Sequence, residues 1–149
     1  SQLEAKGQTK EAEVLRQKQY QENRDIILSF SKSFDFCSVY FFYSSKSEDI
    51  RNGKLNGNLF NSNLELIENQ EFPDFYLTAE FSKTENLGLE GLIIMNSKLF
   101  PLESPFPFYE RKYRFFGLVS HTKSKMVVLM NQHMHELHKF WFPEKEEER

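Results

Sequence analysis

The stretch FYLTAEFSKTENLGLEGLIIMNSK, residues 75–98, decides the fold that the sequence predicts. Residues 75–82 alternate between apolar and more polar side chains, as in a strand with one face on a core and the other in water. Residues 89–98 centre on the apolar run Leu92–Met95, which predicts a second strand. The connection between the two runs is much shorter than a parallel crossover requires, so we expect the strands to pair antiparallel.

Further strand-like runs lie on both sides of this pair. Residues 113–120 and 125–131 are separated only by residues 121–124, which predicts a hairpin. Upstream, residues 36–44 are apolar on both alternations, a pattern typical of a central strand covered on both faces. The sequence therefore predicts an α+β fold with an antiparallel sheet of about five strands.

The N-terminal residues 1–34 contain one Gly and no Pro, which favours a long helix. Apolar residues are sparse at first, and only from Tyr20 onward do they recur at helical offsets that would dock on a core. We therefore expect three parts in the chain: a polar helical arm or tether over residues 1–19, a single globular α+β domain over residues 20–143, and a charged tail over residues 144–149.

Two shorter helices are expected within the domain. Ser45 and Glu48 have the spacing of a capping box and Gly53 is a stop signal, so a short helix is predicted near residues 46–52, directly after the first strand. A C-terminal helix is expected over residues 132–142, because a proline follows it.

The composition excludes several classes of protein. The chain has 19 Lys+Arg against 22 Asp+Glu, and its 16 Phe, 6 Tyr and 1 Trp supply ample core material. A polybasic nucleic-acid binder, a collagen-like chain and a wholly disordered chain are thereby excluded. No run approaches the roughly 18 consecutive apolar residues that span a bilayer. We expect no nucleic-acid partner and no transmembrane segment in this chain.

The compartment is not fixed by the cysteine count. The single cysteine, Cys37, excludes an intramolecular disulfide and a thiolate-rich zinc site. The sequence opens at Ser1 without an initiator Met, which fits a processed leader, a lipidated residue or a membrane anchor upstream, and equally a simple truncation. We favour an exported or envelope-tethered protein over a cytoplasmic one.

The segment 99–109 is the first place to look for a binding surface. It holds three prolines and four aromatic residues, a composition that cannot form a regular interior strand. Its rings either fold back onto the core or stay exposed as an apolar patch that contacts another protein. The candidate partner-binding residues are Phe100, Phe106, Phe108 and Tyr109.

The four histidines are the strongest chemical signal. If the C-terminal segment is helical, His135 and His138 share one flank, and His133 lies on the other flank of an apolar stripe that ends at Trp141. If a strand runs on instead, His133 and His135 share a face. Either arrangement supplies two ligands, so a metal site needs His121 or a carboxylate from elsewhere. We favour histidines that simply flank a buried stripe.

Signals for catalysis are weak, and we lean against an enzyme. Cys37 lies at the start of a predicted core strand, where we expect a buried and inert thiol. Ser120 and His121 are neighbours in sequence, which does not indicate a catalytic triad. Glu80 is expected on the solvent-exposed face of its strand. We name no catalytic residue and expect no cofactor, although a hydrolase assembled from distant positions stays open.

We therefore expect a non-catalytic interaction module, an accessory subunit of a larger complex for which the cell envelope is one setting. The partner would be a larger protein that contacts the aromatic segment 99–109. The alternative function belongs to a different class, a ligand-sensing or metal-binding domain that uses His121, His133, His135 and His138.

Overall fold

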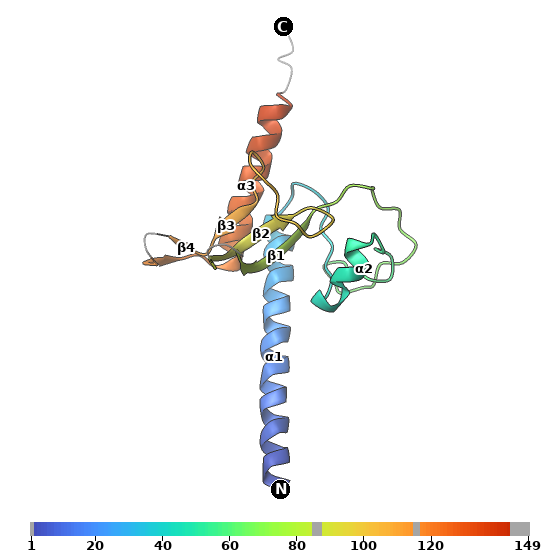
Figure 1. Ribbon diagram of the computed structural model, residues 1–149, viewed down its shortest axis with the longest axis vertical. Coiled ribbons are helices and arrows are strands. Elements are labelled where there is room, and N and C mark those ends of the chain that lie inside the picture. Colours follow the sequence, from blue (N-terminus) through green and yellow to red (C-terminus); the bar gives the residue numbers. More distant parts are fainter. Residues whose placement is uncertain (1, 85–87, 115–116, 144–149) are drawn as a thin grey trace.

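The structure of the protein is a computed structural model that describes residues 2–84, 88–114 and 117–143 (Figure 1). Three helices, one short 3-10 turn and five strands follow one another in these residues. In chain order they are α1 (Gln2–Ser33), η1 (Ser44–Lys46), α2 (Ser47–Arg51), β1 (Thr78–Lys83), β2 (Glu90–Met95), β3 (Tyr109–Arg111), β4 (Tyr113–Arg114), β5 (Val119–Ser120) and α3 (Lys123–Trp141).

The strands form two small antiparallel sheets, so the predicted α+β fold with antiparallel pairing is confirmed. One sheet has the order β1-β2-β3, and β4 pairs with β5 in the other. In the larger sheet Phe81 lies opposite Leu92, and Ile93 lies opposite Tyr109. The strand predicted from residue 75 begins later than expected, at Thr78.

The main core lies on one face of the larger sheet, where α1 and α3 pack against each other and against the strands. Residues opposite each other in an antiparallel pair share a face, so Phe81 and Leu92 point to the same side, toward Phe30 of α1. The buried members of this core are Phe30, Leu92, Ile94, Met126, Val127, Met130 and Met134.

A second, smaller core gathers around α2. Its buried members are Ile50, Leu55 and Leu59. The short helix is thus confirmed, but the predicted capping box does not form, because the N-cap residue is Lys46 and no side chain caps the helix. Gly53 ends the helix as expected: it has a φ of 77°, and its N–H donates to the Ile50 carbonyl at 2.9 Å.

The strand predicted over residues 36–44 is wrong. Within this segment the only strand-like pairing in the described chain is one bridge between Phe41 and Phe60. The segment runs between the two cores, with Val39 and Phe41 packed on the main core and Tyr40 and Phe42 on the smaller one. It is apolar on both alternations because it serves two cores, and not because a sheet covers it on both faces.

The hairpin predicted around residues 121–124 is also wrong, because residues 125–131 belong to α3. Thr122 is the N-cap of that helix, and its side chain accepts a hydrogen bond from the Lys125 N–H at 3.1 Å. Met126, Met130 and Met134 then recur at intervals of one helical turn, which places all three in the core. The C-terminal helix predicted over 132–142 therefore exists but starts nine residues earlier, at Lys123.

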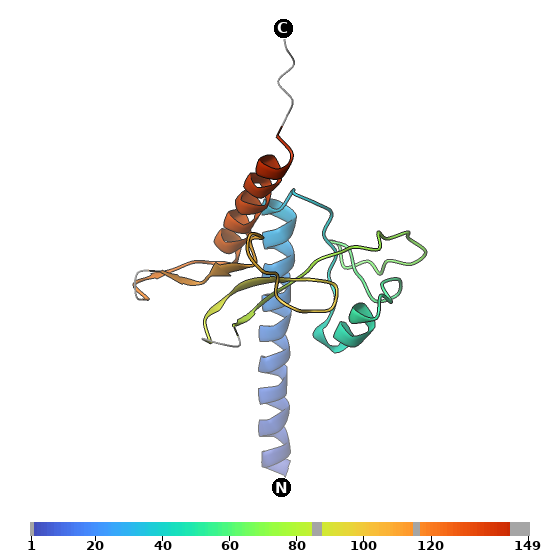
Figure 2. The ribbon, with the colours of Figure 1, turned by 45° about the horizontal axis from the view of Figure 1, so that its top comes forward.

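The long N-terminal helix is confirmed as α1. Its side chains over residues 9–21 are all exposed, whereas Ile26 and Phe30 near its end, and Phe34 just after it, pack on the main core. Figures 1 and 2 show this part of α1 projecting well beyond the sheet, and we refer to residues 9–21 as the arm.

Candidate interaction surface

The aromatic segment 99–109 is an irregular loop whose two ends are fixed to one residue of β2. The N–H of Leu102 donates to the Ile94 carbonyl at 3.0 Å, and the Ile94 N–H donates to the Phe108 carbonyl at 2.8 Å. Between these two bonds the chain makes a short excursion, within which the Phe106 N–H donates to the Glu103 carbonyl. The two hydrogen bonds to Ile94 therefore close the base of the loop and hold it on the buried strand β2.

The turn that leads into this loop is organised by Asn96. Its side-chain oxygen accepts hydrogen bonds from the N–H groups of Lys98 and Phe100, at 2.9 and 3.1 Å. Its backbone N–H donates to the Phe100 carbonyl at 2.8 Å. The Asn96 side chain thus reinforces a backbone turn, in which the Leu99 N–H donates to the Asn96 carbonyl at 2.9 Å, and fixes the backbone that carries Phe100.

Three of the four rings in the loop are exposed. Phe100 is 67%, Phe106 50% and Phe108 39% exposed, while Leu102 between them packs on the main core. The loop thus anchors itself with an aliphatic side chain and leaves its phenylalanine rings in solvent. We call Phe100, Phe106 and Phe108 the aromatic loop surface.

Tyr109, the fourth candidate, plays a different part. It lies in β3, its hydroxyl donates to the Glu90 carbonyl at 3.0 Å, and partial burial raises the pKa of that hydroxyl. Its ring lies directly over Gly91, where any side chain would collide with the ring and with the Glu110 carbonyl. Tyr109 is thus fixed against its neighbouring strand β2. It supports the loop and does not add to the exposed rings.

A second group of exposed rings was missed by the sequence analysis. Phe140, Trp141 and Phe142 at the end of α3 are 81%, 57% and 68% exposed. Trp141 was expected at the end of a buried stripe, which is wrong, because the last turn of α3 extends past the sheet (Figure 1). To predict this exposure from the sequence, one would have needed to know where along the helix the contact with the core ends.

The structure separates the histidines of α3, as the helical arrangement predicts. His133 contacts the carboxylate of Glu110 in β3, which is almost completely buried. His135 lies on the other flank, with its Nε2 2.8 Å from Oδ1 of Asp35. Hydrogen bonds from Asn131 and His135 hold the pKa of the Asp35 carboxyl below its ordinary value.

The other two histidines do not join these pairs. The His138 ring lies edge-on to Phe36 and tilted against Phe142, with centroids 6.0 and 5.1 Å away. His121 precedes α3, its backbone N–H donates to the Lys112 carbonyl, and its buried Nδ1 has no hydrogen-bond partner among the described residues. In residues 2–84, 88–114 and 117–143, no three or more His, Cys, Asp or Glu side chains are grouped so that they could hold a metal ion.

The remaining candidates for catalytic residues, Cys37 and Glu80, are exposed to solvent. Cys37 was expected to be buried, which is wrong, because the residue is exposed. Partial desolvation of its thiol still raises the thiol pKa, which lowers the thiolate fraction that a nucleophile needs. Glu80 is exposed on β1.

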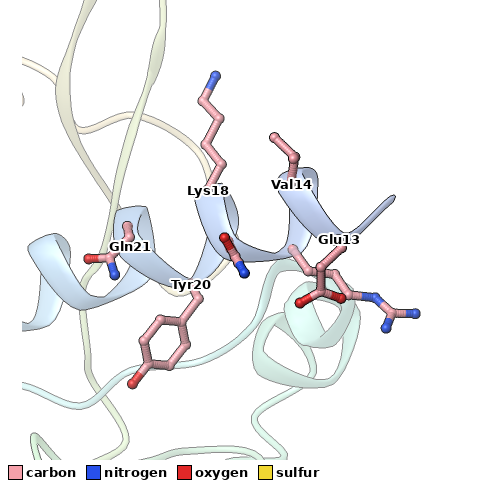
Figure 3. Close-up of a pocket in the computed structure, with 7 residues that line it drawn as sticks. Glu13, Val14, Lys18, Tyr20 and Gln21 are labelled. Atoms are coloured by element: carbon pink, nitrogen blue, oxygen red, sulfur yellow. The ribbon is translucent and has the colours of Figure 1, made fainter. Parts of the chain in front are cut away.

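One surface hollow lies on the arm of α1. The side chains that line it all come from that single helix, and Figure 3 shows them pointing to its different sides. Its labelled residues are Glu13, Val14, Lys18, Tyr20 and Gln21. Because one helix supplies the whole lining, this hollow is open surface and does not enclose a ligand.

Comparison with other proteins adds no functional assignment. No family model, no curated protein and no solved structure matches the chain. Among the helices of the described residues, none combines the length and the apolar character that crossing a bilayer requires.

Proposed function

We propose that the protein is a non-catalytic interaction module, an accessory subunit that binds a larger protein through the aromatic loop surface. The observation that carries this proposal is the exposure of Phe100, Phe106 and Phe108 on a loop whose base is hydrogen-bonded to Ile94. Aromatic side chains are enriched among the residues that dominate binding energy, and a preorganised loop loses little entropy on binding. The polar arm of α1 would suit a tether, and a cell-envelope complex is the setting of the proposal.

The test is recovery of the partner from the native source with purified, tagged protein as bait. Replacing Phe106 and Phe108 by Ser removes two exposed rings without touching the core. If one ring contributes about 2 kcal/mol, as interface hot spots do, the affinity falls roughly thirtyfold and recovery is lost. The Phe75→Ser variant is the matched control, because Phe75 is 72% exposed and lies outside the loop.

The same bait tests the contribution of the arm. A variant that lacks residues 1–19, and so most of the arm, keeps every side chain of the main core. It is expected to fold and to show reduced recovery. Equal recovery by the wild type and the loop variant, with both folded by circular dichroism, would show that the aromatic loop surface is not the binding site.

A further inference from the structure

The free edge of β1 carries a row of backbone groups that point away from the sheet. In β2, Ile94 directs its N–H and carbonyl toward Phe108 and Leu102, on the side of β3. Bonding directions alternate along an antiparallel strand, so the neighbouring residue Ile93 bonds to Glu80 of β1, which lies opposite it. The residues on either side of Glu80 then point outward, and these are Ala79, Phe81 and Lys83.

These outward groups are unpaired in the part of the chain that the structure describes. No backbone hydrogen bond joins Ala79, Phe81 or Lys83 to any described residue outside the sheet. The opposite edge is different, because β3 is only three residues long and lies against α3, where Glu110 meets His133. Natural proteins protect an open edge with a proline, a bulge, a short strand or charged side chains. The six residues of β1 have no proline or bulge, and their charged residues are Glu80 and Lys83.

We infer that β1 accepts an extended, acidic segment of a partner polypeptide as a fourth strand of the sheet. The outward row offers donors and acceptors at every second residue, and the backbone of an extended chain has the matching spacing. This is strand addition, in which backbone bonds supply affinity and alternate side chains supply selectivity.

The charges next to this edge select an acidic strand. Phe81 and Lys83 point to the core face of the sheet, and Nζ of Lys123 lies 5.9 Å from the centroid of the Phe81 ring. The carboxylate of Glu90 is shared between Lys83, at 3.8 Å, and Lys112, at 2.7 Å. Among the described residues, Lys83 and Lys112 thus share one carboxylate, and a Glu on the added strand opposite Lys83 would supply a second one.

A second copy of the chain fits the same edge less well. Symmetric antiparallel pairing of two β1 strands centred on Phe81 makes the most backbone bonds. It places Lys83 of each copy opposite Ala79 of the other and adds no carboxylate to this group of cations. The charge pattern thus favours a different, acidic chain. The edge of β1 is separate from the aromatic loop surface, so either binding proposal can be refuted without the other.

The probe is a capped heptapeptide, Ser-Glu-Thr-Val-Thr-Val-Ser, titrated against the full chain at low salt and followed by fluorescence anisotropy. In antiparallel pairing its Glu lies opposite Lys83 and its two Val lie opposite Phe81 and Ala79. N-methylation of both Val removes donors that face β1 and should abolish binding. N-methylation of both Thr removes donors that face away and should leave binding intact, which makes it the matched control.

Two substitutions test the protein side. Ala79→Pro removes one outward N–H and should weaken binding about tenfold, whereas Ala79→Val keeps that N–H and should not. Lys83→Glu should weaken binding about tenfold by reversing a charge beside the added Glu, and Lys46→Glu, an equal charge change in η1, should not. If the proline variant fails to fold, the methylated peptides and the charge variants still decide the question.

Hydrogen exchange locates the bound strand. Saturating peptide should slow exchange of the Ala79, Phe81 and Lys83 amides by about tenfold or more, with no matching change in the aromatic loop. Absence of binding, or binding without protection of these amides, overturns the inference. Protection that is present without peptide and is lost on dilution also overturns it, because a second copy then occupies the edge.

Discussion

The contact between His133 and Glu110 gives the sharpest prediction for the stability of the fold. The Glu110 carboxylate is almost completely buried, with 5% of its side chain exposed, while the His133 imidazole is 43% exposed. His133→Ala removes the side chain that pairs with this carboxylate in the described residues. The carboxylate then remains buried between β3 and α3 without its partner.

The expected loss of stability is about 2 kcal/mol. A buried polar group left without its hydrogen-bond partner costs roughly 1–3 kcal/mol, and a carboxylate costs more. The cost here should be lower, because the imidazole is partly exposed and its removal admits water to the carboxylate. For a chain of this size a loss of about 2 kcal/mol lowers the melting temperature by roughly 4–8 °C.

The assay is urea unfolding followed by circular dichroism, with a matched control on the same helix. His135→Ala deletes the same side chain, but its partner Asp35 is 81% exposed, so the loss should be clearly smaller. A double variant, Glu110→Leu with His133→Ala, should recover part of the stability, because no carboxylate is left without a partner. Equal losses for His133→Ala and His135→Ala would refute the reasoning.

Three further predictions follow from other parts of the structure. Gly91→Val should destabilise the fold by about 1–3 kcal/mol in urea unfolding, because the new side chain collides with the Tyr109 ring and with the backbone beside it. Asp35 and Glu90 have pKa values lowered from 3.8 and 4.5, chiefly by Asn131 and Lys112 respectively, so the folded state binds fewer protons than the unfolded state. The melting temperature should therefore fall as the pH drops below about 4.5, and less so for Asp35→Asn. The single Trp141, 57% exposed, should be readily quenched by acrylamide in the folded protein; a strongly protected tryptophan would contradict the placement of the end of α3.

Local signals in the sequence were enough for the elements whose environment is simple. The run Leu92–Met95 is apolar on both faces and became the buried part of the central strand β2. The composition of the N-terminal residues predicted helix α1, and Gly53 predicted the end of α2. The aromatic loop followed from its prolines, which prevent a regular strand over residues 99–109.

The errors arose where one segment meets more than one environment. Residues 36–44 pack on two cores, and a strand covered on both faces has the same apolar pattern. Residues 125–131 are rich in valine and methionine, and their helical period becomes visible only when Met134 is included.

The carboxylate partners of the histidines could not be predicted from the sequence, for a different reason. His135 meets Asp35 across a separation of 100 residues, and His133 meets Glu110 from another element. Pairing at that range is set by the packing of α3 on the sheet and leaves no local pattern. The sequence analysis therefore separated the histidines correctly on the helix but had no means of naming their carboxylate partners.

The continuity of α1 has a mechanical consequence. The exposed residues 9–21 and the core residue Phe30 belong to one unbroken helix, so no hinge lies between the arm and the sheet in the described chain. The arm spans about 20 Å at 1.5 Å per residue. A tilt applied to its far part is transmitted as a torque to Phe30 and, through the ring contact with Phe81, to β1. Because the helix is unbroken, the direction of the arm also fixes the directions in which the aromatic loop and the open strand edge face.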